Sequence, residues 1–384
     1  MESRWVRWVG TGVIALGAVG SLATATLGAG QRPWTPAPCD TGTGPTSAAT
    51  VPGPSALTDL GMEAWFRLDP VIDDSGALQG QRISLGLDGV RTVRTMELPP
   101  ESFASGPFGR VVLIGSDNGS DSRLQAVDVT AGCAWAVASE TDVIRRATID
   151  PSGKLVYEAR VDRTSRADLG VWTRALDGAT PARRILDPLE ADDRFGRTFS
   201  TEFAWSTDGQ ELAVQSCGEV ACRTRVVDQT GRSVRSIAEP DLGTMVGLDG
   251  DRLVSYAACP GFPCPIVAVD LRTGSRQVLA DAGAVAVIIS TPDGTRLVHE
   301  SFDGAGLALR SVALDGSSAA ELGPLSDGLR LLPTPDRVEA ATRLPSGWAL
   351  LATDGRLPAD GPADRTQLRH VPDGASVQLD EVVR

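Results

Sequence analysis

The six cysteines are the residues whose type and spacing indicate the most definite chemistry. They divide into two pairs with a shared C-x4-C spacing and one remaining pair: Cys217 and Cys222, Cys259 and Cys264, and Cys39 and Cys133. The two short pairs could supply four thiolates to a zinc ion, but no histidine lies near them and the N-terminus indicates export to an oxidising compartment. We therefore expect two local disulfides and, by elimination, a third bond that joins the N-terminal linker to the first part of the folded domain.

The other side chains form no pattern typical of a catalytic or metal site. The two histidines, His299 and His370, have no serine, cysteine or aspartate arrangement nearby in the sequence that would complete a triad. Tyr157 and Tyr256 lie in apolar segments, which favours core packing over a nucleophilic role. The segment 117–121 lacks the spacing and the bidentate acid of a calcium loop. We predict no catalytic residue, no metal and no cofactor, and enzymatic activity is the less favoured alternative.

Charged residues gather in two segments that interrupt the apolar pattern, 162–168 and the longest insertion, 187–198. We predict that six of these side chains bind a protein or a small ligand: Arg163, Arg166, Asp192, Asp193, Arg194 and Arg197. Binding residues concentrate on variable loops held by a rigid scaffold, although solvated loops without a function can have the same composition.

A repeated element must position these segments, because a short turn followed by an apolar strand recurs along the chain. The turn glycines stand at positions 109, 153, 209, 250, 294 and 347, so the intervals are 44, 56, 41, 44 and 53 residues. Intervals of ~40 to 50 residues are typical of a four-stranded propeller blade. A second turn, rich in Asp and Gly, follows in each unit, and alternating apolar residues between the turns predict half-buried strands. Counting from the second turn gives seven units.

The repeated turn has the form (Ser/Thr/Asp)-x-(Asp/Ser)-Gly-x-x-Leu, and a strand such as Phe203-Ala204-Trp205 precedes it. Over residues 100–350 this pattern resembles the WD40-like (PD40-type) repeat of TolB and of the propellers of prolyl-oligopeptidase-type proteins. The resemblance implies an all-β fold, a six- or seven-bladed β-propeller with seven favoured. The chain lacks a recognisable N-terminal α/β domain of the TolB type and has no G-x-S-x-G motif, so neither the envelope role of TolB nor the hydrolase activity follows from the resemblance.

The N-terminus predicts export. Arg4 and Arg7 precede an uncharged stretch from Trp8 to Gln31, and residues 23–25 supply the small side chains of a signal-peptidase site. The stretch is also long enough to span a bilayer, so a cleaved signal peptide and a retained anchor are both open.

These patterns divide the chain into three parts. Residues 1–30 form a signal peptide or a hydrophobic anchor helix, with a possible membrane tether through residues 8–30. Residues 31–56 form a linker rich in Pro, Gly, Ser and Thr, and residues 57–384 form the β-propeller.

The charge balance limits the possible partners. The chain has 36 basic and 49 acidic residues, a net charge of −13, which excludes binding to nucleic acid through a basic surface. We predict an extracytoplasmic protein, secreted or anchored, that acts as a non-catalytic binding or assembly module of the bacterial cell envelope. Its partner would be an envelope or extracellular protein or a small ligand. The alternative is an extracellular propeller hydrolase or lyase that acts on glycans or peptides.

Overall fold

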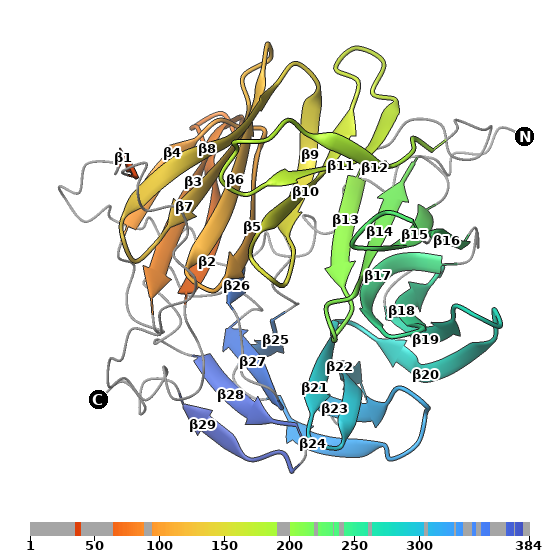
Figure 1. Cartoon of the computed structure of the whole chain (residues 1–384). Helices are drawn as coiled ribbons and strands as arrows, with labels where there is room; N and C mark the ends of the chain where they lie inside the picture. Colours follow the sequence, from red (N-terminus) through yellow and green to blue (C-terminus); the bar gives the residue numbers. More distant parts are fainter. Residues whose placement is uncertain are drawn as a thin grey trace, which may run out of the picture.

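The structure, a computed structural model, describes these residues: 35–39, 64–87, 94–189, 200–218, 222–232, 234–237, 242–259, 263–302, 306–325, 328–332, 340–342, 347–353, 366–371 and 373–378. All regular elements within them are β-strands, which form seven sheets that follow one another around the molecule in chain order (Figure 1). The predicted all-β class is confirmed. The predicted helix in 1–30 lies outside the described residues, and within them no helix is long and apolar enough to cross a membrane.

We number the sheets by their order along the chain. Sheet 1 contains β2 (Ala64–Ile72), β3 (Leu78–Leu87), β4 (Arg94–Leu98) and β26 (Ala340–Thr342). Sheet 2 contains β5 (Ser102–Phe108), β6 (Val111–Asp117), β7 (Ser122–Asp128), β8 (Cys133–Glu140) and β1 (Ala37–Pro38). Sheet 3 contains β9 (Val143–Ile149), β10 (Leu155–Val161), β11 (Asp168–Ala175) and β12 (Arg183–Leu186). Sheet 4 contains β13 (Ser200–Trp205), β14 (Glu211–Cys217), β15 (Cys222–Asp228) and β16 (Val234–Ile237).

The remaining three sheets are four-stranded, like sheets 1, 3 and 4. Sheet 5 contains β17 (Leu242–Asp249), β18 (Arg252–Ala257), β19 (Cys264–Asp270) and β20 (Arg276–Gly283). Sheet 6 contains β21 (Ala286–Thr291), β22 (Gly294–Phe302), β23 (Leu307–Ala313) and β24 (Ala320–Pro324). Sheet 7 contains β25 (Leu329–Leu331), β27 (Trp348–Thr353), β28 (Thr366–His370) and β29 (Ser376–Gln378).

Each sheet has an inner and an outer edge. The first strands of successive sheets contact one another, as β5 contacts β9 and β9 contacts β13, so these strands lie nearest the centre. Because neighbouring strands are antiparallel, the first-to-second and third-to-fourth connections emerge at one end of the sheets. We call this end the turn face; it contains 150–154 and 271–275. The opposite end, which contains 118–121 and 162–167, is the loop face.

Aspartate and glycine close the turn face, as the repeat predicts. In the β9–β10 turn, a side-chain oxygen of Asp150 accepts hydrogen bonds from the backbone N–H groups of Lys154 (2.8 Å) and Leu155 (2.6 Å). Gly153 and Gly209 occupy the same place in successive turns, each with φ near +71°, a conformation that glycine adopts without steric cost. The repeated sequence pattern therefore specifies the direction of each chain reversal.

The ring closes in a way that the repeat does not predict. β26 belongs by sequence to the last unit, between β25 and β27, but it pairs with β2 and forms the inner strand of sheet 1. The register pairs Trp65 with Thr342 and Arg67 with Ala340. The first and last units are therefore interlocked.

The N-terminal linker is attached to the outer edge of sheet 2. β1 pairs in parallel with β8, and the Cys39–Cys133 disulfide fixes this contact across 94 residues of sequence. Cys217–Cys222 and Cys259–Cys264 also form disulfides, each closing a connection on the loop face. All three predicted pairings are confirmed.

The hydrophobic core lies between neighbouring sheets. Phe66, Ile83 and Met96 of sheet 1 pack against Val112 and Ile114 of sheet 2, and comparable clusters join the sheets that follow. Burial of each such side chain stabilises the fold by about 1.5–3 kcal/mol relative to its exposure. The apolar positions that alternate along each strand therefore hold the sheets to one another.

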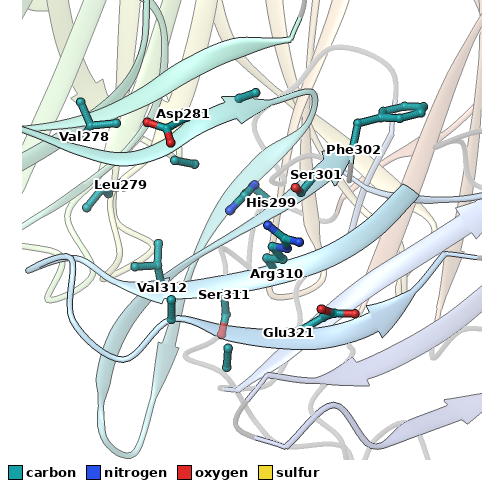
Figure 2. Close-up of a pocket in the computed structure, with 14 residues that line it drawn as sticks. Val278, Leu279, Asp281, His299, Ser301, Phe302, Arg310, Ser311, Val312 and Glu321 are labelled. Carbon is teal, nitrogen blue, oxygen red and sulfur yellow. The ribbon is translucent and has the colours of Figure 1, made fainter. Parts of the chain in front are cut away.

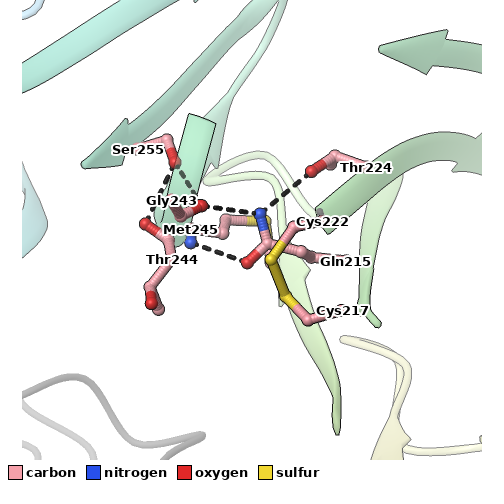
Figure 3. The surroundings of a disulfide bond; sticks show 8 residues. All are labelled: Gln215, Cys217, Cys222, Thr224, Gly243, Thr244, Met245 and Ser255. Carbon is pink, nitrogen blue, oxygen red and sulfur yellow. Dashed lines mark hydrogen bonds between the residues drawn. A yellow bond between two sulfur atoms is a disulfide. The ribbon is translucent and has the colours of Figure 1, made fainter. Parts of the chain in front are cut away.

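Two buried polar side chains link one sheet to the inner strand of the next. Gln215 on β14 accepts a hydrogen bond from the backbone N–H of Met245 (2.9 Å) and donates one to the carbonyl of Gly243 (3.0 Å), beside the Cys217–Cys222 disulfide (Figure 3). Glu300, which like Gln215 lies six residues after its turn glycine, accepts a hydrogen bond from the backbone N–H of Leu331 (2.7 Å). Both side chains satisfy backbone groups that the inner strand cannot pair within its own sheet.

Glu300 allows a test of this link. Burial raises the pKa of its carboxyl group above the ordinary value of 4.5, against the opposing effects of the Leu331 N–H and the Arg330 charge. As pH rises above about 4.5, the Glu300 carboxyl therefore ionises in the unfolded chain before it ionises in the folded protein, and the folded wild-type protein loses stability. Glu300→Gln does not ionise and keeps an oxygen acceptor for the Leu331 N–H, so it avoids this loss. In denaturant unfolding, we expect the free energy of unfolding of Glu300→Gln to equal that of the wild type near pH 4 and to exceed it at pH 7.

Glu300→Leu is the matched variant without an acceptor. Because Glu300→Leu leaves the Leu331 N–H unpaired, it should lower the free energy of unfolding by about 1–3 kcal/mol relative to Glu300→Gln at both pH values. A Glu300→Gln protein that loses as much stability as Glu300→Leu would contradict the proposed link.

Candidate functional site

The described part of the predicted binding segments lies on the loop face of sheet 3. Arg163 and Arg166 belong to the β10–β11 connection, as predicted. Asp192, Asp193, Arg194 and Arg197 lie outside the described residues. Asp168 accepts a hydrogen bond from the Leu189 backbone N–H (2.6 Å), so the beginning of the predicted insertion is attached beside this connection.

Arg163 connects two sheets. Its Nη1 lies 2.7 Å and 3.0 Å from the two carboxylate oxygens of Asp117, at the end of β6, and its Nε donates to the carbonyl of Thr141 (2.9 Å). The Asp117 side chain is 6% exposed and that of Arg163 is 25% exposed, so the pair is largely shielded from solvent. The positive charge of Arg163 is therefore neutralised within the protein.

Arg145 is the functional candidate that the sequence patterns did not identify. In the pairing of β9 with β10, Ile144 lies opposite Arg160 and Arg146 opposite Ala159, so Arg145 is the extra residue of a β-bulge. A bulge redirects a side chain away from the regular alternation of a strand. The break in alternation at Val143-Ile144-Arg145-Arg146 is the signal that could have indicated it.

Arg145 and Arg166 interact electrostatically with each other on this face. Burial lowers the pKa of Arg145, and the nearby charge of Arg166 lowers it further, while Glu101 and Asp117 act in the opposite direction. Both guanidinium groups remain charged at neutral pH because arginine does not deprotonate in proteins. Nε of Arg145 and Nη1 of Arg166 are buried and have no hydrogen-bond partner among the described residues.

Arg166 has a backbone conformation that is unusual for its type. Its φ is +60°, and its backbone N–H donates to the carbonyl of Asp162 (2.9 Å), the first residue of the connection. A side chain other than glycine costs roughly 1–2 kcal/mol in the left-handed region. Asp162 stabilises the turn by accepting from the Ser165 N–H, an interaction that also lowers the pKa of Asp162.

Beneath these residues, two arginines and two glutamates form a closed ionic network. Arg160 Nη2 lies 2.6 Å from Glu158 Oε2 and 3.0 Å from Glu140 Oε1. Arg174 Nε lies 2.7 Å from Glu158 Oε1, and Arg174 also pairs with Glu140. Glu158 is fully buried, and Arg160 lies over the ring of Trp172 at 4.8 Å. Each charge has an opposite partner, so this network supports the loop face and leaves no free carboxylate.

The two tyrosines occupy the core, as predicted. Tyr157 is fully buried, packs edge-on against Trp205 and donates from its hydroxyl to the carbonyl of Gln229 (3.1 Å). Burial raises its pKa to about 12, so it does not ionise at neutral pH. Tyr256 is 5% exposed and donates to the carbonyl of Ala284 (3.4 Å). Neither hydroxyl is positioned as a nucleophile.

His370 lies on the turn face, away from the arginines. Its Nδ1 is 2.8 Å from a carboxylate oxygen of Asp373, and its ring packs against Trp348 at 4.8 Å. The backbone N–H of Ala375 and the His370 ring lower the pKa of Asp373. These contacts close a turn and involve no serine or cysteine.

His299 lines a pocket of about 620 Å³ between sheets 5 and 6 (Figure 2). Burial lowers the pKa of His299, which favours the neutral ring, and its Nδ1 lies 3.3 Å from the carbonyl oxygen of Glu300. Arg310 on β23 is the strand partner of His299 on β22. The exposed side chains of Phe302 and Val278 border the pocket. Within the described residues His299 has no hydrogen bond to a serine hydroxyl.

No group of three or more histidine, cysteine, aspartate or glutamate side chains in the described ranges could hold a metal ion. The cysteines are all disulfide-bonded, which removes the zinc alternative. The arginines of the loop face can donate charge-assisted hydrogen bonds.

Solved structures share this fold, whereas no protein-family profile and no curated protein matches the sequence. A prolyl endopeptidase is similar with a TM-score of 0.54 and 15% identity over 84% of this chain, which spans about half (49%) of that enzyme. An oligogalacturonate lyase from Vibrio parahaemolyticus has a TM-score of 0.50 and 10% identity, covering 82% of this chain and 84% of the lyase. TolB from Acinetobacter baumannii has a TM-score of 0.43 and 13% identity, covering 77% of this chain and 68% of TolB. The predicted likeness to the propellers of prolyl-oligopeptidase-type proteins is confirmed for the fold alone.

The buried ionic network gives a test of the loop-face framework. Glu158→Gln keeps the side-chain volume but leaves Arg160 and Arg174 with one carboxylate between them, and breaking a buried pair costs about 3–5 kcal/mol. Glu97→Gln is the matched control, because the Glu97 side chain is 56% exposed and pairs with an exposed arginine. Glu97→Gln should lower the free energy of unfolding by less than about 1 kcal/mol. Equal losses for the two variants in urea unfolding would contradict the network.

Proposed function

We propose that this protein is an exported, non-catalytic β-propeller that serves as a binding or assembly module of the bacterial cell envelope. In this proposal each of the seven sheets is one blade of a domain that spans residues 57–384. Residues 31–56 link the domain to an export signal or membrane anchor in residues 1–30. The binding surface is the loop face, and the partner is an envelope or extracellular protein or a small ligand.

One observation carries the choice of surface. Arg145 and Arg166 have buried N–H groups without a hydrogen-bond partner in the described part of the chain. Buried donors in folded proteins are almost always paired, so these two groups are suited to an acceptor that a partner supplies. Arg163 on the same face pairs through Nη1 with Asp117 and through Nε with the Thr141 carbonyl, and it orders the connection that bears Arg166. Its Nη2 is also buried without a hydrogen-bond partner among the described residues.

The described carboxylates favour binding over proton transfer. A general acid or base must reach the substrate and have a pKa near the working pH. Glu300 has a raised pKa but is fully buried and bonded to Leu331. Glu140 is more accessible, but although burial opposes ionisation, the contacts of Arg174 and Arg160 lower its pKa. The hydrolase or lyase alternative would require a different group, and similarity to such enzymes in fold does not supply one.

The three disulfides support an extracytoplasmic location, because such bonds persist in oxidising compartments. We expect protein recovered from cell envelopes without reductant to give no reaction with a thiol reagent after denaturation. Six reactive thiols should appear after reduction, one for each cysteine. Reactive Cys217 and Cys222 before reduction would contradict the proposed location.

Site-specific crosslinking in intact cells tests the binding surface. A photoreactive residue at Thr164, exposed on the loop face, should form a discrete adduct, and one at Thr273, exposed on the turn face, should not. Combining Thr164 labelling with either Arg145→Gln or Arg166→Asn should reduce the adduct about tenfold or more, since each lost hydrogen bond to a charged group is worth about 1.5–3 kcal/mol. Equal adducts at the two positions, or no effect of the arginine substitutions, would count against the proposal.

A further inference from the structure

We propose that Arg145 and Arg166 together bind one singly charged oxyanion group, a carboxylate or a phosphodiester, and so select an anionic partner. This inference rests on the proposed use of the loop face for binding and names the chemistry that the face recognises. It assigns the recognition to two side chains from different elements, one in the inner strand β9 and one in the β10–β11 connection.

The available hydrogen-bond donors set the type of ligand. Arginine presents N–H groups only, in a planar arrangement that matches the paired oxygens of a carboxylate or a phosphate group. Arg145 Nε and Arg166 Nη1 are buried and have no acceptor in the described ranges, and neither side chain forms an ion pair there. A neutral ligand would offer weaker acceptors, because hydrogen bonds to ionised acceptors are roughly twice as strong.

The local charge sets the charge of the ligand. The charged groups that affect Arg145 are Arg166, Glu101 and Asp117. Asp117 directs both of its oxygens to Arg163, so it is already neutralised. Among the charges that act on Arg145, the Arg166 guanidinium group and the carboxylate of the exposed Glu101 remain. Arg145, Arg166 and Glu101 together carry one net positive charge, which a singly charged oxyanion would balance on a chain whose net charge is −13.

Two irregularities of the backbone bring the side chains to this place. Arg145 is the extra residue of the β9 bulge, and Arg166 has a φ of +60°. Asparagine or glycine would fit the second conformation with less strain, so the structure retains arginine there at a cost. Strain of this kind clusters at ligand sites, and here both irregular residues are arginines whose buried donors have no partner.

Arg163 acts as a positioning residue. Its bonds to Asp117 and to the Thr141 carbonyl tie the β10–β11 connection to sheet 2. If this tie were lost, Asp117 would become available to Arg145 and would compete with the ligand. We therefore expect Arg163→Gln to weaken anion binding although Arg163 does not contact the anion.

The test is ligand-observed NMR on the purified full-length chain at constant ionic strength. The probes are glucuronate for a carboxylate, dimethyl phosphate for a phosphodiester, and methyl glucoside as a neutral control. We expect saturable binding of at least one anionic probe and none of methyl glucoside. The probe that binds more tightly identifies the source of the oxyanion. Arg145→Gln and Arg166→Asn should each weaken its binding about tenfold or more, since each removes charged hydrogen bonds.

Matched variants separate recognition from folding. Arg166→Asn suits the left-handed backbone, so its melting temperature should equal or exceed that of the wild type while binding is lost. Arg272→Gln removes a 71%-exposed arginine from the turn face and should leave binding unchanged. Absence of binding by both anionic probes, or equal weakening by Arg272→Gln, would overturn the inference. If a probe binds but no adduct forms at Thr164, the anion site is supported and the proposed envelope partner is contradicted. If the adduct forms but neither anionic probe binds, the partner is supported and the anion site is contradicted.

Discussion

The pairing of β26 with β2 is the interaction on which the rest of the structure depends. A propeller of separate sheets must join its first and last units, because an open strand edge would expose unpaired N–H and C=O groups. Here the chain returns from sheet 7 to supply the inner strand of sheet 1 before it completes sheet 7 itself. The ring is thereby closed by backbone hydrogen bonds between residues some 270 positions apart, as in Phe66 with Ala341. The inner strands, including β9 with its bulge, keep their places because this ring is closed.

Polar groups buried between the sheets are the second constraint. Gln215 and Glu300 satisfy backbone N–H groups on the next inner strand, and Glu158 holds two buried arginines. A buried polar group without a partner is costly, so each of these contacts also specifies how neighbouring sheets are placed. Arg145 and Arg166 are among the side chains of the described residues that have a buried polar atom without a hydrogen-bond partner.

The two ends of the sheets differ in a way that bears on function. The turn face is built from short Asp-Gly turns whose carboxylates bind their own backbone, as Asp150 and Asp270 do. On the loop face, two connections are closed by disulfides and one is tied to the neighbouring sheet by Arg163. Rigid presentation of donors reduces the conformational entropy that binding must overcome. This difference favours the loop face as the surface that meets a partner.

The sequence alone determined the all-β class, the turn series, the cysteine pairs and the core role of Tyr157 and Tyr256, because these follow from local turn chemistry, strand periodicity and cysteine count. It also located Arg163 and Arg166 in a connection between strands. It did not show that Arg163 forms an ion pair with Asp117 whereas Arg166 forms none among the described residues, and it did not identify Arg145. Ring closure by β26 was likewise not predicted. Those features depend on contacts between residues far apart in sequence, and a bulge, an ion pair between sheets and a strand exchanged between units exist only when the sheets are assembled.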